Sequence, residues 1–186
     1  MKRNHLISTI AGAGLGLAVV GGVAATTLLP ADTPGGPSTA AAAVAPQAVA
    51  QRDVLSADAL VAAAEAGLAE AQDQGQQVTI AIVDRSGATR LVLKTDNAGP
   101  QTQESAEQKA YTSAAMGQPT GALAENATGD GPTIADLPGT LFLAGGVPVL
   151  SGETPIAGIG VGGAPSGDID EEIAQAALEA LENFEE

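Results

Sequence analysis

The sequence predicts an α/β domain in which a five-stranded antiparallel sheet carries helices on its faces. Three observations support this prediction. Two groups of apolar segments are joined by turns of only a few residues, which is typical of antiparallel hairpins. Segments with apolar residues at helical spacing precede, separate and follow these groups. The chain has 186 residues, which is enough for one such domain and an N-terminal extension.

Residues 1–25 are predicted to be an export signal, because Lys2 and Arg3 precede an uncharged apolar stretch. An uncleaved anchor is the alternative, since this stretch is long enough to span a bilayer. Residues 26–52 are rich in proline and alanine and are predicted to be a linker. The folded domain is predicted to span residues 53–186. We expect it to be secreted, with cell-surface association as an alternative and without membrane insertion after cleavage.

The first helix and the first hairpin follow in order. Ser56 is a suitable N-cap, and apolar residues at helical spacing continue until Gly75 ends the helix. Residues 78–84 are apolar on both faces, which predicts a central strand. Residues 85–88 are expected to turn the chain back into a second strand over residues 89–95.

A second helix is predicted from Thr102, a suitable cap, to Met116. Small residues on one of its faces would allow a very close approach to a neighbouring element. A short helix over residues 120–125 and a loop over residues 126–136 are predicted to follow.

The predicted sheet ends with three strands, at residues 140–144, 147–150 and 156–161. Gly145-Gly146 favours a hairpin turn between the first two, and Pro148 favours an edge position. The last strand is rich in glycine and so has a surface without side chains. We expect a ligand or another subunit's backbone to approach it closely.

The last helix is predicted to begin near Gly167, with Ser166 or Asp168 as its cap. Acidic residues fill its first turn, where they interact favourably with the helix dipole. An apolar stripe along the rest of the helix predicts that it packs on the sheet.

Composition excludes several classes of function. The formal net charge of −15 argues against nucleic acid as a partner, because such a surface repels phosphate backbones. The absence of cysteine excludes disulfides, thiolate zinc sites and Fe–S clusters. The only histidine, His5, lies in the predicted signal. A cleaved chain would therefore have no Ser-His-Asp triad and no histidine-bound zinc or haem.

Glu104 and Glu107 lie three residues apart, on one face of the second predicted helix. Two carboxylates at this spacing can share a hard cation such as iron, calcium or magnesium. A solvated helix face explains the same spacing, so the pattern alone leaves both interpretations open.

Four motifs cover much of the predicted domain: residues 83–87 (VDRSG), 98–112 (AGPQTQESAEQKAYT), 137–146 (LPGTLFLAGG) and 158–171 (GIGVGGAPSGDIDE). Together they resemble the GlcG/HbpS-like family, which is labelled haem-degrading. The resemblance implies a profilin-like α/β sandwich and an octameric assembly. It also implies an extracytoplasmic protein that binds haem and iron and serves a membrane sensor kinase of a two-component system responding to haem and redox stress.

The resemblance also implies site residues. Thr140, in the Pro-Gly-Thr turn, would contact haem, and Glu104 and Glu107 would bind iron. Members of the family have a haem-binding histidine near the C-terminus, where this chain has none. The remaining candidates for the haem-iron ligand are Thr140, Lys109, Tyr111, Met116 and the carboxylates.

Other functions remain open at this point. The resemblance also allows an enzyme that degrades haem or acts on another small molecule, and a corrinoid-binding protein. The lack of histidine, cysteine and an obvious nucleophile–base pair in a cleaved chain argues against an enzyme. A purely structural extracellular oligomer is the third hypothesis.

Overall fold

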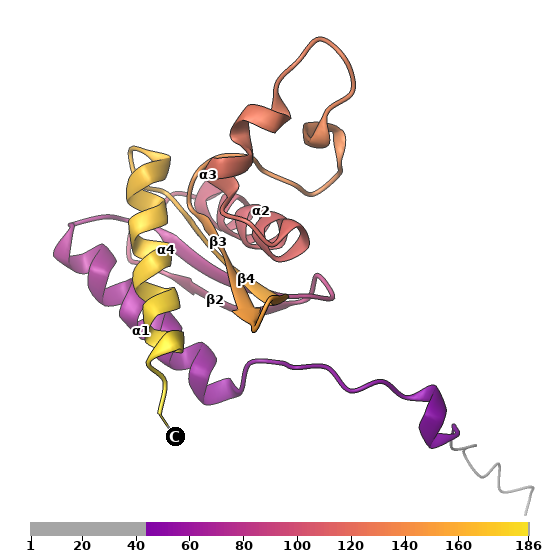
Figure 1. The fold of residues 1–186 in the computed structure, drawn as a ribbon. Coiled ribbons are helices and arrows are strands. Elements are labelled where there is room, and N and C mark those ends of the chain that lie inside the picture. The colour runs from indigo at the N-terminus through magenta and orange to yellow at the C-terminus, as the bar shows by residue number, and fades with distance from the viewer. Residues whose placement is uncertain (1–43, 186) are drawn as a thin grey trace, which may run out of the picture. The chain divides into compact units, whose positions relative to one another are not determined.

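The computed structural model describes residues 44–185, so the predicted export signal and most of the predicted linker lie outside the described residues (Figure 1). Gln47–Glu186 form one unit. No helix in the described part is long and apolar enough to cross a membrane. The helices are α1 (Ala57–Asp73), α2 (Gln101–Met116), α3 (Thr120–Leu123) and α4 (Gly167–Glu182), and the strands are β1 (Thr79–Asp84), β2 (Thr89–Lys94), β3 (Gly146–Ser151) and β4 (Thr154–Gly162).

The sheet has four antiparallel strands in the order β2-β1-β4-β3. Strand β1 is central, as its apolar character on both faces predicted, and Pro148 lies on the edge strand β3. The β1–β2 hairpin and the tight turn between β3 and β4 are also confirmed.

The prediction of a fifth strand over residues 140–144 is wrong. Side chains from the helices take the hydrogen bonds that a neighbouring strand would need. The Leu141 N–H donates to the Thr112 hydroxyl at 2.9 Å, and the Thr120 hydroxyl donates to the Leu143 carbonyl at 2.6 Å. Gly145-Gly146 is therefore not a hairpin turn, and β3 begins at Gly146.

Helices cover both faces of the sheet. Helices α1 and α4 pack on one face and α2 on the other (Figure 1). The larger core lies under α1 and α4, where Ile80, Ile82 and Ile159 are fully buried. On the α2 side the core consists of small side chains, so α2 lies close to the sheet.

Helix α2 is the element that approaches the glycine-rich strand. A Cβ atom at Gly158 would collide with the carbonyl oxygen of Ala110, and one at Gly160 with that of Ala106. The predicted close approach is therefore real, but it comes from the same chain rather than from a ligand or another subunit.

The helix caps agree with the sequence except at α2. Ser56 caps α1 by accepting the Ala59 N–H at 3.2 Å, and Ser166 caps α4. Helix α2 begins at Gln101, after Pro100, and has no side-chain cap. The predicted cap, Thr102, lies inside the helix, where its hydroxyl is buried and hydrogen-bonds Gly99 and Thr79.

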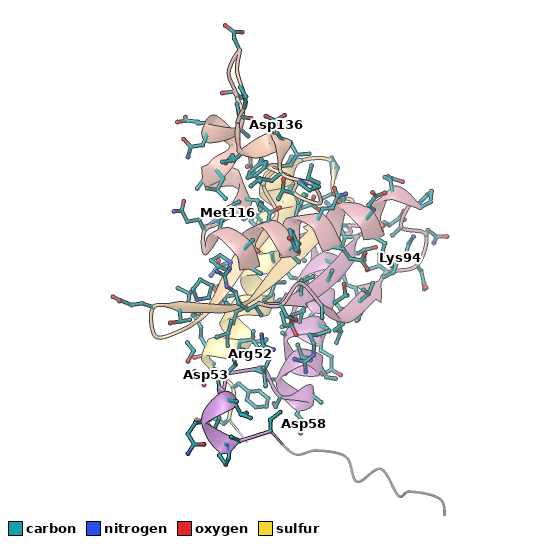
Figure 2. All side chains as sticks on the ribbon, turned by 90° about the vertical axis from the view of Figure 1, so that its right-hand side faces the viewer. Arg52, Asp53, Asp58, Lys94, Met116 and Asp136 are labelled. Carbon is teal, nitrogen blue, oxygen red and sulfur yellow. The ribbon has the colours of Figure 1, made fainter. Side chains whose placement is uncertain are left out.

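A loop between α3 and β3 projects from the body of the domain (Figure 1). It contains two short 3-10 turns, Ala124–Ala127 and Ile134–Asp136. A capping box closes the second turn, because the Asp136 carboxylate accepts the Thr133 N–H at 2.7 Å. Asp136 lies at the opposite end of the domain from Arg52 and Asp53, which precede α1 (Figure 2).

Candidate functional site

A groove of about 270 Å³ runs along the exposed face of α2. It is bounded by α2, by the β1–β2 hairpin and by the segment that leads into β3. Its lining residues are Val83, Gly87, Thr89, Glu104, Glu107, Gln108, Tyr111 and Gly139.

The four α2 residues in the groove share one helix face because they lie at positions i, i+3, i+4 and i+7. The opposite face of α2 carries Ala106 and Ala110, which are fully buried against the sheet. Packing of the alanine face therefore turns Glu104, Glu107 and Tyr111 outward into the groove.

The two glutamates contact only neutral partners among the described residues. The Gln108 amide donates to Glu104 and the Gln103 amide donates to Glu107, both at 3.2 Å. In the described part of the chain no ion pair involves either carboxylate, and no three acidic, histidine or cysteine residues group together as a metal site. The pair can therefore offer a cation two side-chain ligands from one helix face.

Tyr111 lies between two loop glycines. A Cβ atom at Gly87 would be 3.1 Å from Cε2 of the ring, and one at Gly139 would be 4.0 Å from Cε1. These atoms are on opposite edges of the ring, so each glycine faces one edge. The side chain is 38% exposed. Both glycines have positive φ, +85° and +79°, which other residues rarely adopt.

Hydrogen bonds fasten the hairpin to α2 and so fix Gly87 beside the ring. The Asp84 carboxylate accepts the N–H groups of Ser86 and Ala88, at 2.8 and 3.2 Å, and the Ser86 hydroxyl. The Ser86 hydrogen bond is the main cause that lowers the pKa of Asp84 below its usual value. The Arg85 guanidinium donates to two carbonyl groups in the last turn of α2.

Thr140 and Lys109, the other two predicted site residues, do not line this groove. Thr140 directly follows Gly139 at its rim, and its hydroxyl donates to the Leu137 carbonyl at 2.7 Å. Lys109 is 3% exposed, and its ammonium lies 2.7 Å from the Asp170 carboxylate and 2.9 Å from the Val161 carbonyl. The structure thus brings Glu104, Glu107 and Tyr111 together, places Thr140 next to them and sets Lys109 apart.

The Lys109–Asp170 ion pair joins α2 to the first turn of α4. Burial raises the pKa of Asp170, and the hydrogen bond from Lys109 opposes this rise. The carboxylate also accepts the Ala164 N–H at 3.0 Å. Sequence reasoning missed this pair. The signal was a lysine on the alanine-rich face of α2, but nothing local identified the acid that it meets.

The groove combines oxygen donors with a rim that includes two glycines. At this rim an added Cβ at Gly87 would press on the Tyr111 ring at 3.1 Å, whereas one at Gly139 would make an ordinary contact at 4.0 Å. The phenol and two carboxylates supply oxygen donors for ferric iron, and tyrosine is an established haem ligand. The described residues contain neither histidine nor cysteine. Sequence reasoning did not single out Gly87, Gly139 or Asp84 for this site, although they belong to the motifs at residues 83–87 and 137–146.

Comparison with known proteins identifies the family to which the chain belongs. A family model described as "Haem degrading protein HbpS-like" matches residues 55–179. The search of curated proteins finds no match. A crystal structure of Streptomyces reticuli HbpS, a double mutant with two Glu-to-Asp changes three positions apart, is 44% identical with a TM-score of 0.74. The alignment covers 78% of this chain and 99% of that one.

Two further structures extend the comparison. A PduOC–haem complex is 27% identical, with a TM-score of 0.64 over 69% of this chain and 95% of that chain. A Klebsiella pneumoniae protein, ORFY, is 23% identical, with a TM-score of 0.67 over 73% of this chain and 97% of that one, and shows the shared fold alone. The chain belongs to the HbpS-like family.

Proposed function

We propose that this protein binds haem in the groove along α2. The observation that carries the proposal is the grouping of Tyr111, Glu104 and Glu107 around one groove with a glycine rim. Membership of the HbpS-like family supports it, and the PduOC relative has been crystallised with haem.

The charges of the groove define how haem would lie. The two glutamates repel the haem propionates, so the propionates would point away from them toward solvent. Lys109 is not available to the iron, because it is buried and its ammonium is paired with Asp170.

Iron binding by Glu104 and Glu107 is a second proposed function. Both carboxylates line the groove, and no described cation neutralises them. The crystallised S. reticuli double mutant was altered at two glutamates with the same spacing, which marks such a pair as a feature of that relative. If haem and iron use the same groove, ferric ion bound first should weaken haem binding.

We further propose that the protein is secreted, assembles as an octamer and acts as accessory to a membrane sensor kinase. The family resemblance supports these three proposals. Size-exclusion chromatography with light scattering tests the octamer. Recovery of the protein in the culture medium with its first 25 residues removed tests secretion and the predicted signal. Crosslinking to a membrane kinase, with and without haem, tests the partnership.

Titration of the purified protein with haemin, read by absorbance, tests the haem proposal. A saturable change with the chain's circular dichroism spectrum intact supports it, and no saturable change contradicts it. Loss of bound haem after a reductant and oxygen are added would favour the haem-degrading enzyme over a binding protein. Saturable binding of a corrinoid in place of haem would favour the corrinoid alternative.

A further inference from the structure

Resting on the proposed octamer, we propose that a groove between β3 and α4 is the surface through which two copies of this chain pack against each other. This β3–α4 groove has a volume of about 630 Å³. It is lined mainly by apolar side chains of β3, of the second half of α4 and of the segment before α1. Glu182 is the only charged residue in its lining.

The β3–α4 groove lies at the margin of the main core. Val147 and Val149 of β3 are buried members of that core. Leu178 and Leu181 of α4 pack on it but remain partly exposed, and Leu150 is 48% exposed. A partner that covers these side chains would remove apolar surface from water, which stabilises a complex.

The two edge strands of the sheet are protected in different ways. Strand β2 carries the exposed Arg90 and Lys94, and charges on an edge strand discourage contact with other chains. Strand β3 has no charged residue. Pro148 has no N–H, and the Gly146 N–H already donates to the Thr120 hydroxyl at 2.9 Å, so an added strand would find few donors on β3. We therefore expect the partner to pack through side chains in the groove rather than to extend the sheet.

Charge favours a second copy as the occupant. The formal net charge of −15 makes two copies repel each other, so they can meet only where the surface carries little charge. Four other hollows in the described part of the chain each have two or more charged residues in their linings. The β3–α4 groove has only Glu182. A cationic partner would instead be attracted to the carboxylates elsewhere on the chain.

The groove and Leu150 form a self-complementary patch. Leu150 is the most exposed large apolar side chain of the lining, and the hollow lies beside it. In a two-fold contact the same patch of both copies meets, so Leu150 of each copy can enter the groove of the other. An octamer can be assembled from dimers that are joined in this way.

Size-exclusion chromatography with light scattering on the purified wild type, Leu150→Asp and Val92→Asp tests this surface. Val92 is the matched control, because it is 38% exposed on β2, the opposite edge strand. The wild type and Val92→Asp should have the same assembled mass. Leu150→Asp should dissociate, with a dissociation constant at least about tenfold higher, because its carboxylate would be buried against an apolar surface.

Introduced thiols decide the question if Leu150→Asp does not fold. The chain has no cysteine, so Leu150→Cys and Val92→Cys would each carry a single thiol. The exposures in one chain, 48% against 38%, favour faster maleimide labelling of Leu150→Cys. A second copy over the groove reverses this order, and Leu150→Cys should react at least about tenfold more slowly than Val92→Cys.

The outcomes separate this interface from the proposed assembly. A folded wild type that is monomeric would contradict the octamer and the interface together. If the wild type assembles but a correctly folded Leu150→Asp has the same mass, or Leu150→Cys labels as fast as Val92→Cys, the interface alone is overturned. Saturable binding of an apolar peptide by a monomeric wild type, lost in Leu150→Asp, would assign the groove to a different occupant.

Discussion

Replacing Lys109 with methionine is predicted to destabilise the fold strongly. Methionine is similar in length, so most of the packing is kept, but the buried Asp170 carboxylate loses its partner. The side chains of Lys109 and Asp170 are 3% and 5% exposed, so water cannot take the place of the ammonium. Breaking a buried pair costs about 3–5 kcal/mol, and we expect the free energy of unfolding to fall by about 4 kcal/mol.

Urea unfolding followed by circular dichroism at neutral pH measures this loss. The control is Lys94→Met, because Lys94 is exposed and its ammonium donates to the Gly99 carbonyl at 2.8 Å. That variant should lose less than about 1 kcal/mol. Adding Asp170→Asn to Lys109→Met should recover part of the loss, since the amide is neutral and its oxygen still accepts the Ala164 N–H. If Lys109→Met costs no more than Lys94→Met, the reasoning is refuted.

Three further predictions concern pH, packing and charge. Burial raises the pKa of Asp170 above 3.8, so the folded protein keeps a proton on Asp170 at pH values where the unfolded chain has lost it. The stability of the wild type relative to Asp170→Asn should therefore fall as the pH rises from 3.8 through the folded pKa. Urea unfolding at several pH values measures this difference, and a rise in relative stability over that range would contradict the prediction. Gly160→Ala should cost about 3 kcal/mol by forcing α2 from β4, whereas Gly131→Ala, with open space around it, should be nearly neutral by thermal unfolding. Glu104→Gln combined with Glu107→Gln should weaken iron binding about tenfold in calorimetry, yet strengthen haemin binding a few-fold by removing like charge; unchanged affinities for both ligands would contradict the groove assignment.

Helical periodicity predicted one part of the candidate site, the common helix face of its two glutamates. The spacing of Glu104 and Glu107 placed them on one face, and Tyr111 follows Glu107 one turn later on that face. The contacts of Gly87 and Gly139 with the Tyr111 ring could not be predicted, because they join two loops distant in the chain. The Lys109–Asp170 pair spans 61 residues and has no local signature.

The fold was predictable where local patterns determine it. The first hairpin and the edge position of Pro148 follow from apolar alternation and from proline's missing N–H. The segment over residues 140–144 is largely apolar, like a buried strand, but Thr112 and Thr120 bind two of its backbone groups, the Leu141 N–H and the Leu143 carbonyl. Glycines in β4 signalled a close neighbour without identifying it, since only the tertiary packing shows that α2 fills the space.

Haemin titration of the purified wild-type protein, followed by absorbance, tests the central claim most directly. The account predicts saturable binding with one haem per chain. A protein that keeps its native circular dichroism spectrum but shows no saturable change with haemin would contradict it.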